Sequence, residues 1–218
     1  MSVASFKPLA KRIVNFWYGG ALPAVSEGLP SDSVKRWYMG GAEFDEEIRV
    51  EFGTEVEKAL EAPEKWPQEV FQFDDADPEE ASAAIIVLDQ FTRNLYRDDP
   101  TAFAADARAL ALADHFVANG TDVRAQELHP SLATLIYHPF MHSENLEAQN
   151  RGIALLEKLT STLPEEHPYF PTLNTNLDYF KKHRDVIEQF GRFPHRNDVL
   201  GRTSTPEEIE AVANGMRF

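Results

Sequence analysis

The sequence contains no cysteine, which excludes disulfide bonds, thiolate nucleophiles and metal or iron–sulfur centres built on thiolates. It has no apolar run long enough to span a bilayer, since the best run, residues 83–88, ends at Asp89. Basic residues are also scarce: 21 Lys and Arg face 36 Asp and Glu, a net charge of −15. Because nucleic acids and anionic membrane surfaces attract broad basic faces, this charge predicts neither as a partner.

Signals for export, for strands and for nucleotide binding are missing as well. No apolar segment with a cleavage site follows Lys7, Lys11 and Arg12, so we expect no signal peptide and a cytoplasmic protein. No sustained two-residue alternation predicts a strand, and no glycine-rich phosphate loop predicts a nucleotide, so we expect no cofactor. With 218 residues, 43% of them hydrophobic, and no flexible linker, the chain is predicted to form a single domain over residues 1–218.

The spacing of apolar residues is typical of helices. Residues 77–80 (DPEE) combine a capping carboxylate with a proline at the first helical position, and they predict a helix over about 78–96. A second helix is predicted from residues 99–100 (DP) to a left-handed cap at 119–120 (NG), folded back on the first as an antiparallel hairpin. Further helices are predicted near 7–18, 31–38, 43–61, 145–162 and 174–190, and from Thr205 onward. The expected fold class is all-α, built of packed antiparallel helical hairpins.

Three polar clusters interrupt this pattern, and the first lies in the second half of the 78–96 helix. Asp89 and Arg93 are four residues apart and therefore lie on one face, where they can pair. Gln90 and Asn94 form a second polar pair at the same spacing. A salt bridge with a structural role is the common outcome for such a pair, yet four polar groups on an apolar helix all need partners.

The second cluster contains two histidines four residues apart, His138 and His142. Pro139 places His138 at or before a helix start, where the two side chains no longer stack, so we predict no metal site. In the structural interpretation, Ser143 caps the following helix and Glu144 lies at its positive end. His142 is then left without a structural explanation.

The third cluster is a basic segment, residues 181–202, which carries a net charge of +3 within an acidic chain. Its glycines and prolines define a turn-rich path rather than a solvated helical face. Arginine binds carboxylates and phosphates through its planar fork, so the segment is predicted to face an anion. That anion is either an external ligand or an internal carboxylate such as Asp89 or Glu144.

The motifs in these clusters resemble one known family. They are NFWYG at 15–19, LDQFTRN at 88–94, MHSE at 141–144, FGRFPHRN at 190–197, LGR at 200–202 and ST at 204–205. In order and spacing, from about residue 13 to 212, they resemble the domain-of-unknown-function family 924. The resemblance implies an all-α, tetratricopeptide-like superhelix with no established activity. Thr92 departs from the proline usual in the family, and His138 departs from the usual aliphatic residue, which further weakens a two-histidine metal site.

Three functional hypotheses follow from these residues. In the first, a small anionic molecule or an acidic peptide end binds in a pocket whose candidate ligand-binding residues are Asp89, Arg93, Arg192, Arg196 and Asn197. In the second, a hydrolase-type enzyme uses acid–base catalysis, with candidate catalytic residues His142, Glu144 and His195. In the third, the polar motifs lock the helices together and the protein is a scaffold without a pocket.

Each hypothesis predicts a different structure. An anion-binding site requires an open cavity and at least two arginines without carboxylate partners. An enzyme requires a contact between a histidine and a carboxylate inside the cavity. A scaffold predicts closed packing around the motifs.

Overall fold

The computed structural model describes residues 6–61, 66 and 76–216, and within them every regular element is helical. The all-α prediction is therefore confirmed. The elements are α1 (Lys7–Tyr18), α2 (Ser31–Met39), α3 (Gly41–Glu61), α4 (Pro78–Ile85), η2 (Ile86–Phe91), α5 (Thr92–Leu95), η3 (Pro100–Phe103), α6 (Asp106–Ala118), α7 (Thr121–Leu128), α8 (Pro130–His142), α9 (Leu146–Ser161), α10 (Phe170–Phe190), η4 (Pro194–Arg196) and α11 (Pro206–Ala213). In the described ranges, no helix is both long and apolar enough to cross a bilayer.

Local capping signals place the helix starts where the sequence predicts them. Asp77 and Glu80 form the capping box of α4, and Thr205 and Glu208 form that of α11. At the end of α10, Gly191 adopts a left-handed conformation with φ 69°, which favours glycine because it has no Cβ.

The predicted helices over 78–96 and from 99–100 onward are each divided. The first contains a π-helical segment, η2, between α4 and α5. The second begins as a 3₁₀ turn, η3, and continues as α6 only from Asp106. Helix α10 begins at Phe170, earlier than the predicted 174.

The prediction misses helices α7 and α8. Pro139, expected at or before a helix start, lies inside α8 near its carboxyl end. A proline there removes a single backbone hydrogen bond, and the helix ends three residues later. Because α8 is buried on nearly every side, its apolar residues show no one-sided pattern that could reveal it.

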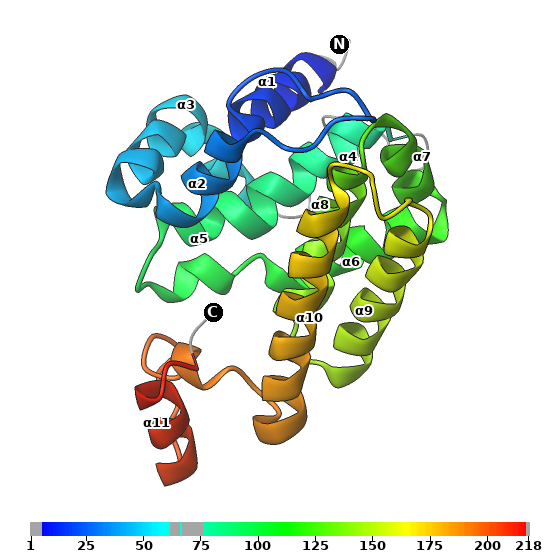
Figure 1. Ribbon diagram of the computed structural model, residues 1–218. Helices are drawn as coiled ribbons and strands as arrows, with labels where there is room; N and C mark the ends of the chain where they lie inside the picture. The colour runs from blue at the N-terminus through cyan, green and yellow to red at the C-terminus, as the bar shows by residue number, and fades with distance from the viewer. Residues whose placement is uncertain (1–5, 62–65, 67–75, 217–218) are drawn as a thin grey trace.

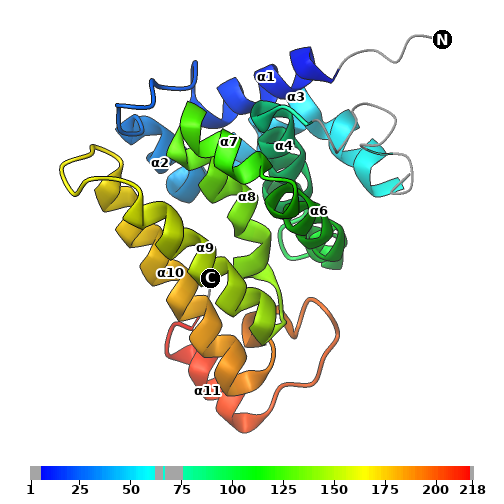
Figure 2. The same cartoon turned by 90° about the vertical axis from the view of Figure 1, so that its right-hand side faces the viewer.

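Helix α8 runs through the middle of the molecule and packs against α4, α6, α7 and α9 (Figure 1). Helices α7 to α10 pack against one another in chain order, as stacked hairpins do, while their tetratricopeptide-like character stays a prediction. One apolar core extends from Phe6 to Phe180, and a small second cluster of Val186, Ile187 and Phe193 holds the C-terminal segment. Helices α1 to α3 lie at one end of the molecule and α11 at the other (Figures 1 and 2).

Candidate functional site

The π-helical segment η2 carries Asp89, whose side chain is completely buried. The neighbours Val87, Leu88 and Phe91 are fully buried in the core, and within the segment only the side chain of Gln90 is partly exposed. A π-helical turn is wider than an α-helical turn, and such turns are frequent at functional sites. A carboxylate in this position must find its partners inside the protein.

The central contact joins Asp89 to His142 at the end of α8. The Nδ1 atom of His142 lies 2.8 and 2.9 Å from the two carboxylate oxygens. The Gln90 amide donates to the same carboxylate at 2.6 Å. Burial, reinforced by the charge of Arg93, lowers the pKa of His142 to about 4. Burial alone would raise the pKa of Asp89, but the charge of Arg93 and the hydrogen bond from His142 hold that pKa well below its usual value. At neutral pH the pair is therefore a neutral imidazole and a carboxylate.

A closed ring of five residues holds this pair in place. Arg93 donates from Nη1 to Asp89 at 3.1 Å and from Nη2 to both oxygens of Asp106 at 2.9 and 3.0 Å. Arg196 donates from Nη1 to Asp106 at 3.1 Å and from Nη2 to the backbone carbonyl of His142 at 3.1 Å. We call these five residues, His142, Asp89, Arg93, Asp106 and Arg196, the charge ring. Its two carboxylates and two guanidinium groups cancel, so the ring carries no net charge around a neutral His142.

Aromatic side chains cover the charge ring on the side of η4. The Arg196 guanidinium lies 4.5 Å from the ring centroid of Phe103 and 4.4 Å from that of Phe193. Its side chain is only 7% exposed, and burial lowers its pKa to about 10. A guanidinium tolerates burial between two aromatic faces because it is attracted to their electron clouds.

Two further arginines of the basic segment, Arg192 and Arg202, form ion pairs with glutamates. Arg202 contacts both oxygens of Glu144 at 2.7 and 3.0 Å, and Arg192 contacts both oxygens of Glu208 at 2.7 and 2.8 Å. Asn197 donates to Glu208 at 3.2 Å. These contacts bind the C-terminal segment to the loop between α8 and α9 and to α11.

The structure unites four of the predicted site residues, Asp89, Arg93, His142 and Arg196, in the charge ring. Of the others, Arg192 and Asn197 contact Glu208, and His195 lies on η4 with its ring centroid 5.6 Å from that of Phe193. His142 contacts Asp89, whereas Glu144 contacts Arg202 and the Phe193 backbone N–H, so the carboxylate that meets His142 is that of Asp89. Glu144 lies two residues beyond the end of α8, and its carboxylate faces the C-terminal segment.

Two local predictions are wrong. The side chain that caps α9 belongs to Asn145, which accepts from the Ala148 N–H, whereas Ser143 accepts from the Asn145 N–H. His138 lies inside α8 on the same face as His142, with ring centroids 6.0 Å apart. The second error has the same cause as the missed helix, because Pro139 does not end α8.

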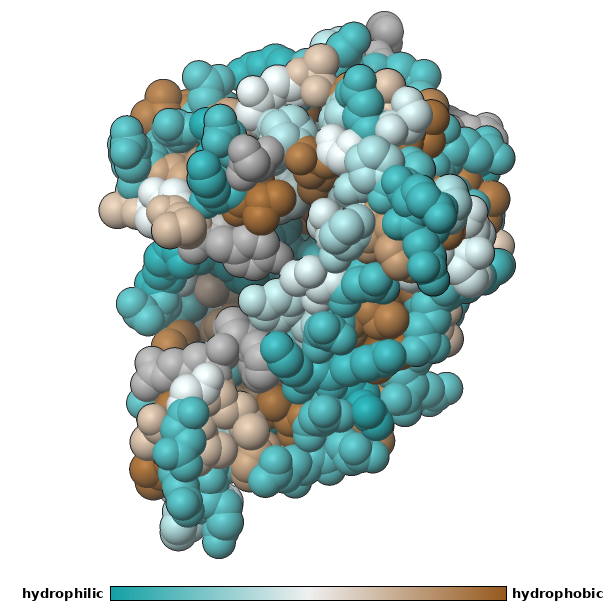
Figure 3. All heavy atoms as spheres, in the orientation of Figure 1, coloured by the Kyte–Doolittle hydropathy of each residue, from teal (hydrophilic) through white to brown (hydrophobic). Residues whose placement is uncertain are grey.

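On its other side, His142 faces a cleft of about 730 Å³ between α1, α2, α8 and α10. Figure 3 shows the surface hollowed between α2 and α10. Aromatic rings form much of the wall: Trp17, Tyr18, Trp37, Tyr169, Tyr179 and Phe180. Gln90, Thr172 and Asn176 supply neutral polar groups. None of the described residues that line the cleft is Asp, Glu, Lys or Arg.

Three histidines line this cleft, and a hydrogen bond fixes the Nδ1 atom of each. His142 bonds Asp89, His138 bonds the Thr134 carbonyl at 2.8 Å, and His183 bonds the Tyr179 carbonyl at 2.7 Å. Carboxylates and carbonyls only accept, so each Nδ1 carries the proton and each Nε2 carries the lone pair. Burial lowers the pKa of His138 and brings that of His183 to about 3, so both rings are neutral at pH 7.

Sequence reasoning misses Asp106 and the aromatic wall, and it includes His183 in the basic segment without naming it as a site residue. Asp106 begins α6, where an acidic residue is ordinary for a helix start, so nothing marks it as the bridge between two arginines. His183 lies at the start of the basic segment and gives no spacing signal with His142. The aromatic residues come from helices far apart in the chain, and only Trp17 and Tyr18 share a motif, NFWYG at 15–19.

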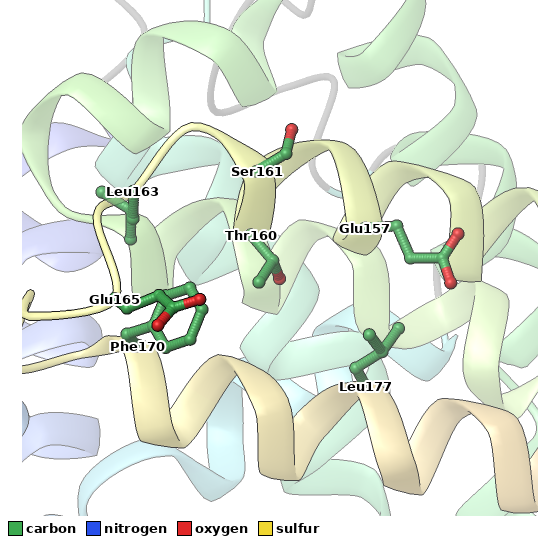
Figure 4. A pocket seen from close by; sticks show the side chains of 7 residues that line it. All are labelled: Glu157, Thr160, Ser161, Leu163, Glu165, Phe170 and Leu177. Atoms are coloured by element: carbon green, nitrogen blue, oxygen red, sulfur yellow. The ribbon is translucent and has the colours of Figure 1, made fainter.

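A second hollow of about 320 Å³ lies between the end of α9 and the start of α10 (Figure 4). Its polar groups are two glutamates and two hydroxyls, and Glu157 is paired with Lys181 at 3.2 Å. It holds no histidine. Across the described ranges, no three His, Asp or Glu side chains are grouped so that they could hold a metal ion.

The fold and site define a helical protein with a histidine–carboxylate pair open to an aromatic cleft. The chain belongs to the family described as bacterial protein of unknown function (DUF924), whose model matches residues 13–216. It is similar to the solved structure of the protein of unknown function ATU0120 from Agrobacterium tumefaciens, with 29% identity and a TM-score of 0.74 over 97% of this chain and 100% of that one. No curated protein matches the chain.

Proposed function

We propose that the protein is a hydrolase-type enzyme that performs acid–base catalysis in the aromatic cleft, with His142 as the general base. The observation that carries the proposal is the Asp89–His142 contact at 2.8 Å on the wall of a cavity. Asp89 fixes the imidazole tautomer so that the lone pair of Nε2 faces the cleft. Nε2 of His142 then removes a proton from water, and the carboxylate stabilises the imidazolium that forms.

The charge ring supports this role by positioning the pair. Asp89 is held by Arg93, and the His142 backbone is held by Arg196, so both partners are fixed from behind. A base oriented within a few tenths of an ångström needs this kind of rigid support. With a pKa near 4, His142 is in its basic form throughout the neutral range, and kcat/KM is expected to fall only below about pH 5.

The structure favours this hypothesis over an anion-binding site. In the described part of the basic segment, Arg184, Arg192, Arg196 and Arg202 each contact a carboxylate, so two unpaired arginines are not offered to a ligand. The cleft itself is lined by uncharged residues. An anion that entered the cleft would lose its hydration without gaining a positively charged partner on the described wall.

The test is a screen of ester, amide and phosphoester substrates with the wild type, His142→Gln and Asp89→Asn. We expect both variants to lose about 10²–10⁴-fold in kcat, the usual contribution of a positioned general base. His195→Gln is the matched control, because His195 does not line the cleft in the described structure. An activity that His142→Gln retains in full contradicts the proposal.

A structural role is the second candidate, and the closure of the charge ring favours it. Buried networks with every member bonded fix the arrangement of helices whether or not chemistry occurs. This role predicts that removal of ring residues costs stability alone.

A further inference from the structure

We infer that the cleft binds an uncharged ring compound that carries hydroxyl or N–H donors. This inference rests on the proposed function, because it names the class of molecule that would meet His142. It adds the charge and hydrogen-bonding character of that molecule, which the acid–base chemistry alone does not specify.

The described wall of the cleft carries no charged side chain. The lining residues include aromatic, aliphatic, hydroxyl, amide and imidazole side chains, but none that is ionised at neutral pH. In a chain with 26% charged residues this is an unusual composition for so large a surface. The charge ring lies behind His142, and its ionised groups neutralise one another.

The imidazoles of His138 and His142 present hydrogen-bond acceptors to the cleft. The Nδ1–H groups of His138 and His142 are bonded to protein acceptors, so their Nε2 atoms offer lone pairs. Neither Nε2 has a bond to another group in the described chain, and neither is sealed from solvent as an orphaned buried atom. Two acceptors on one face of α8, with ring centroids 6.0 Å apart, select a ligand that donates.

The volume and the aromatic wall of the cleft indicate the shape of the ligand. A volume of about 730 Å³ is within the ordinary range for small-molecule sites. The indole rings of Trp17 and Trp37 are stacked at 5.2 Å, and Tyr18 lies edge-on to Trp37 at 5.7 Å. Walls of this kind favour a flat ring, because aromatic pairs gain from offset-stacked and edge-to-face contact.

The probes are three naphthalenes that differ in one group. 2-Naphthol has a donor and no charge, 2-methoxynaphthalene has no donor, and 2-naphthoate is an anion. Calorimetric titration of the full chain at pH 7 should give a Kd for 2-naphthol at least tenfold below that of either analogue. Equal or tighter binding of 2-naphthoate overturns the inference, and so does the absence of 2-naphthol binding at millimolar concentration.

A variant connects the preference to the acceptors. His138→Phe keeps an aromatic ring but removes one acceptor, and it lies outside the proposed catalytic pair. It should reduce the preference for 2-naphthol over 2-methoxynaphthalene at least threefold, whereas the same substitution at His115, away from the cleft, should not. If His138→Phe leaves the preference for 2-naphthol over 2-methoxynaphthalene unchanged, the ligand's donor does not bond to this face of α8 and the assignment is overturned.

Failure of this inference and failure of the proposed function are distinguishable. The binding preference is measured without turnover, so it can hold while His142→Gln leaves activity unchanged. Conversely, an activity that depends on His142 but acts on anions would sustain the catalytic proposal and contradict the ligand class.

Discussion

The two sides of the His142 imidazole differ in the charge of their surroundings, in their hydrogen bonds to the protein and in their exposure to the cleft. On the Nδ1 side, Asp89, Arg93, Asp106 and Arg196 form a closed set of charged hydrogen bonds. On the Nε2 side, the described cleft wall is uncharged and open. The charge ring therefore holds the His142 imidazole in place from its Nδ1 side, and the opposite side of the imidazole lies on the cleft wall.

The largest effect is expected from opening the charged side with Arg196→Ala. Asp106 and the His142 carbonyl each lose a buried donor, and removing one partner of a buried ion pair typically costs about 3 kcal/mol or more. For a domain of this size, the midpoint of thermal unfolding should fall by about 6–12 °C.

The control for this variant is Arg184→Ala, whose carboxylate partners Asp185 and Glu188 are mostly exposed. Surface pairs contribute about 0–1 kcal/mol, so the midpoint should fall by less than about 3 °C. Equal losses in the two variants would show that the charge ring is no stronger than a surface pair.

A smaller effect is expected from pH, through His142. Its pKa is about 4 in the folded protein and about 6.5 in the unfolded chain, so below pH 6.5 the unfolded chain binds a proton that the folded protein does not. The stability due to the neutral imidazole is complete above about pH 6.5 and is lost as the pH falls toward 4. Between pH 7 and pH 5 the loss is about 2 kcal/mol.

His142→Gln removes this titration. Thermal unfolding of wild type and variant, measured at pH 7 and pH 5, should show a steeper decline for the wild type by about 4–8 °C. Parallel declines would mean that the imidazole is not held neutral by its surroundings.

The smallest effect is expected on the open side, from His138→Phe. The Nδ1 atom of His138 bonds only a carbonyl of its own helix, and its ring lies 6.1 Å from that of Phe180, a contact that phenylalanine can keep. Loss of about 1 kcal/mol for the hydrogen bond is offset by the added apolar area, so the midpoint should stay within about 3 °C of wild type. A fall as large as that of Arg196→Ala would show that the cleft side is structural too, as the scaffold hypothesis requires.

Sequence reasoning succeeds where the determining contacts are local. The Asp89–Arg93 pair follows from helical spacing, and the structure confirms it at 3.1 Å. The predicted helix starts at 77–80 and at Thr205 are confirmed for the same reason, since the capping box at each start joins residues three apart. Pro139 shows the limit: a local rule predicts that the helix breaks there, yet burial of α8 on nearly all sides keeps it helical.

The candidate site was predictable only in its parts. The motifs supply Asp89, Arg93, His142 and Arg196, but no spacing indicates that they form one ring. Asp106 joins two arginines, and neither its helix-start position nor its neighbours distinguish it from other acidic residues. The separation of Glu144 from His142 was equally invisible, because it depends on where α8 ends and on where Arg202 lies.

The all-α class, most helix starts, the family and the polar residues that need partners follow from the sequence alone, because these depend on residues a few positions apart or on motifs in order. The partners of those polar residues depend on the tertiary structure: Asp89 meets His142 across 53 positions, and Asp106 meets Arg196 across 90. The cleft likewise exists only where α1, α2, α8 and α10 come together. Contacts at such separations are selected by the packing of whole helices around a shared core, and no periodicity in the chain records that choice.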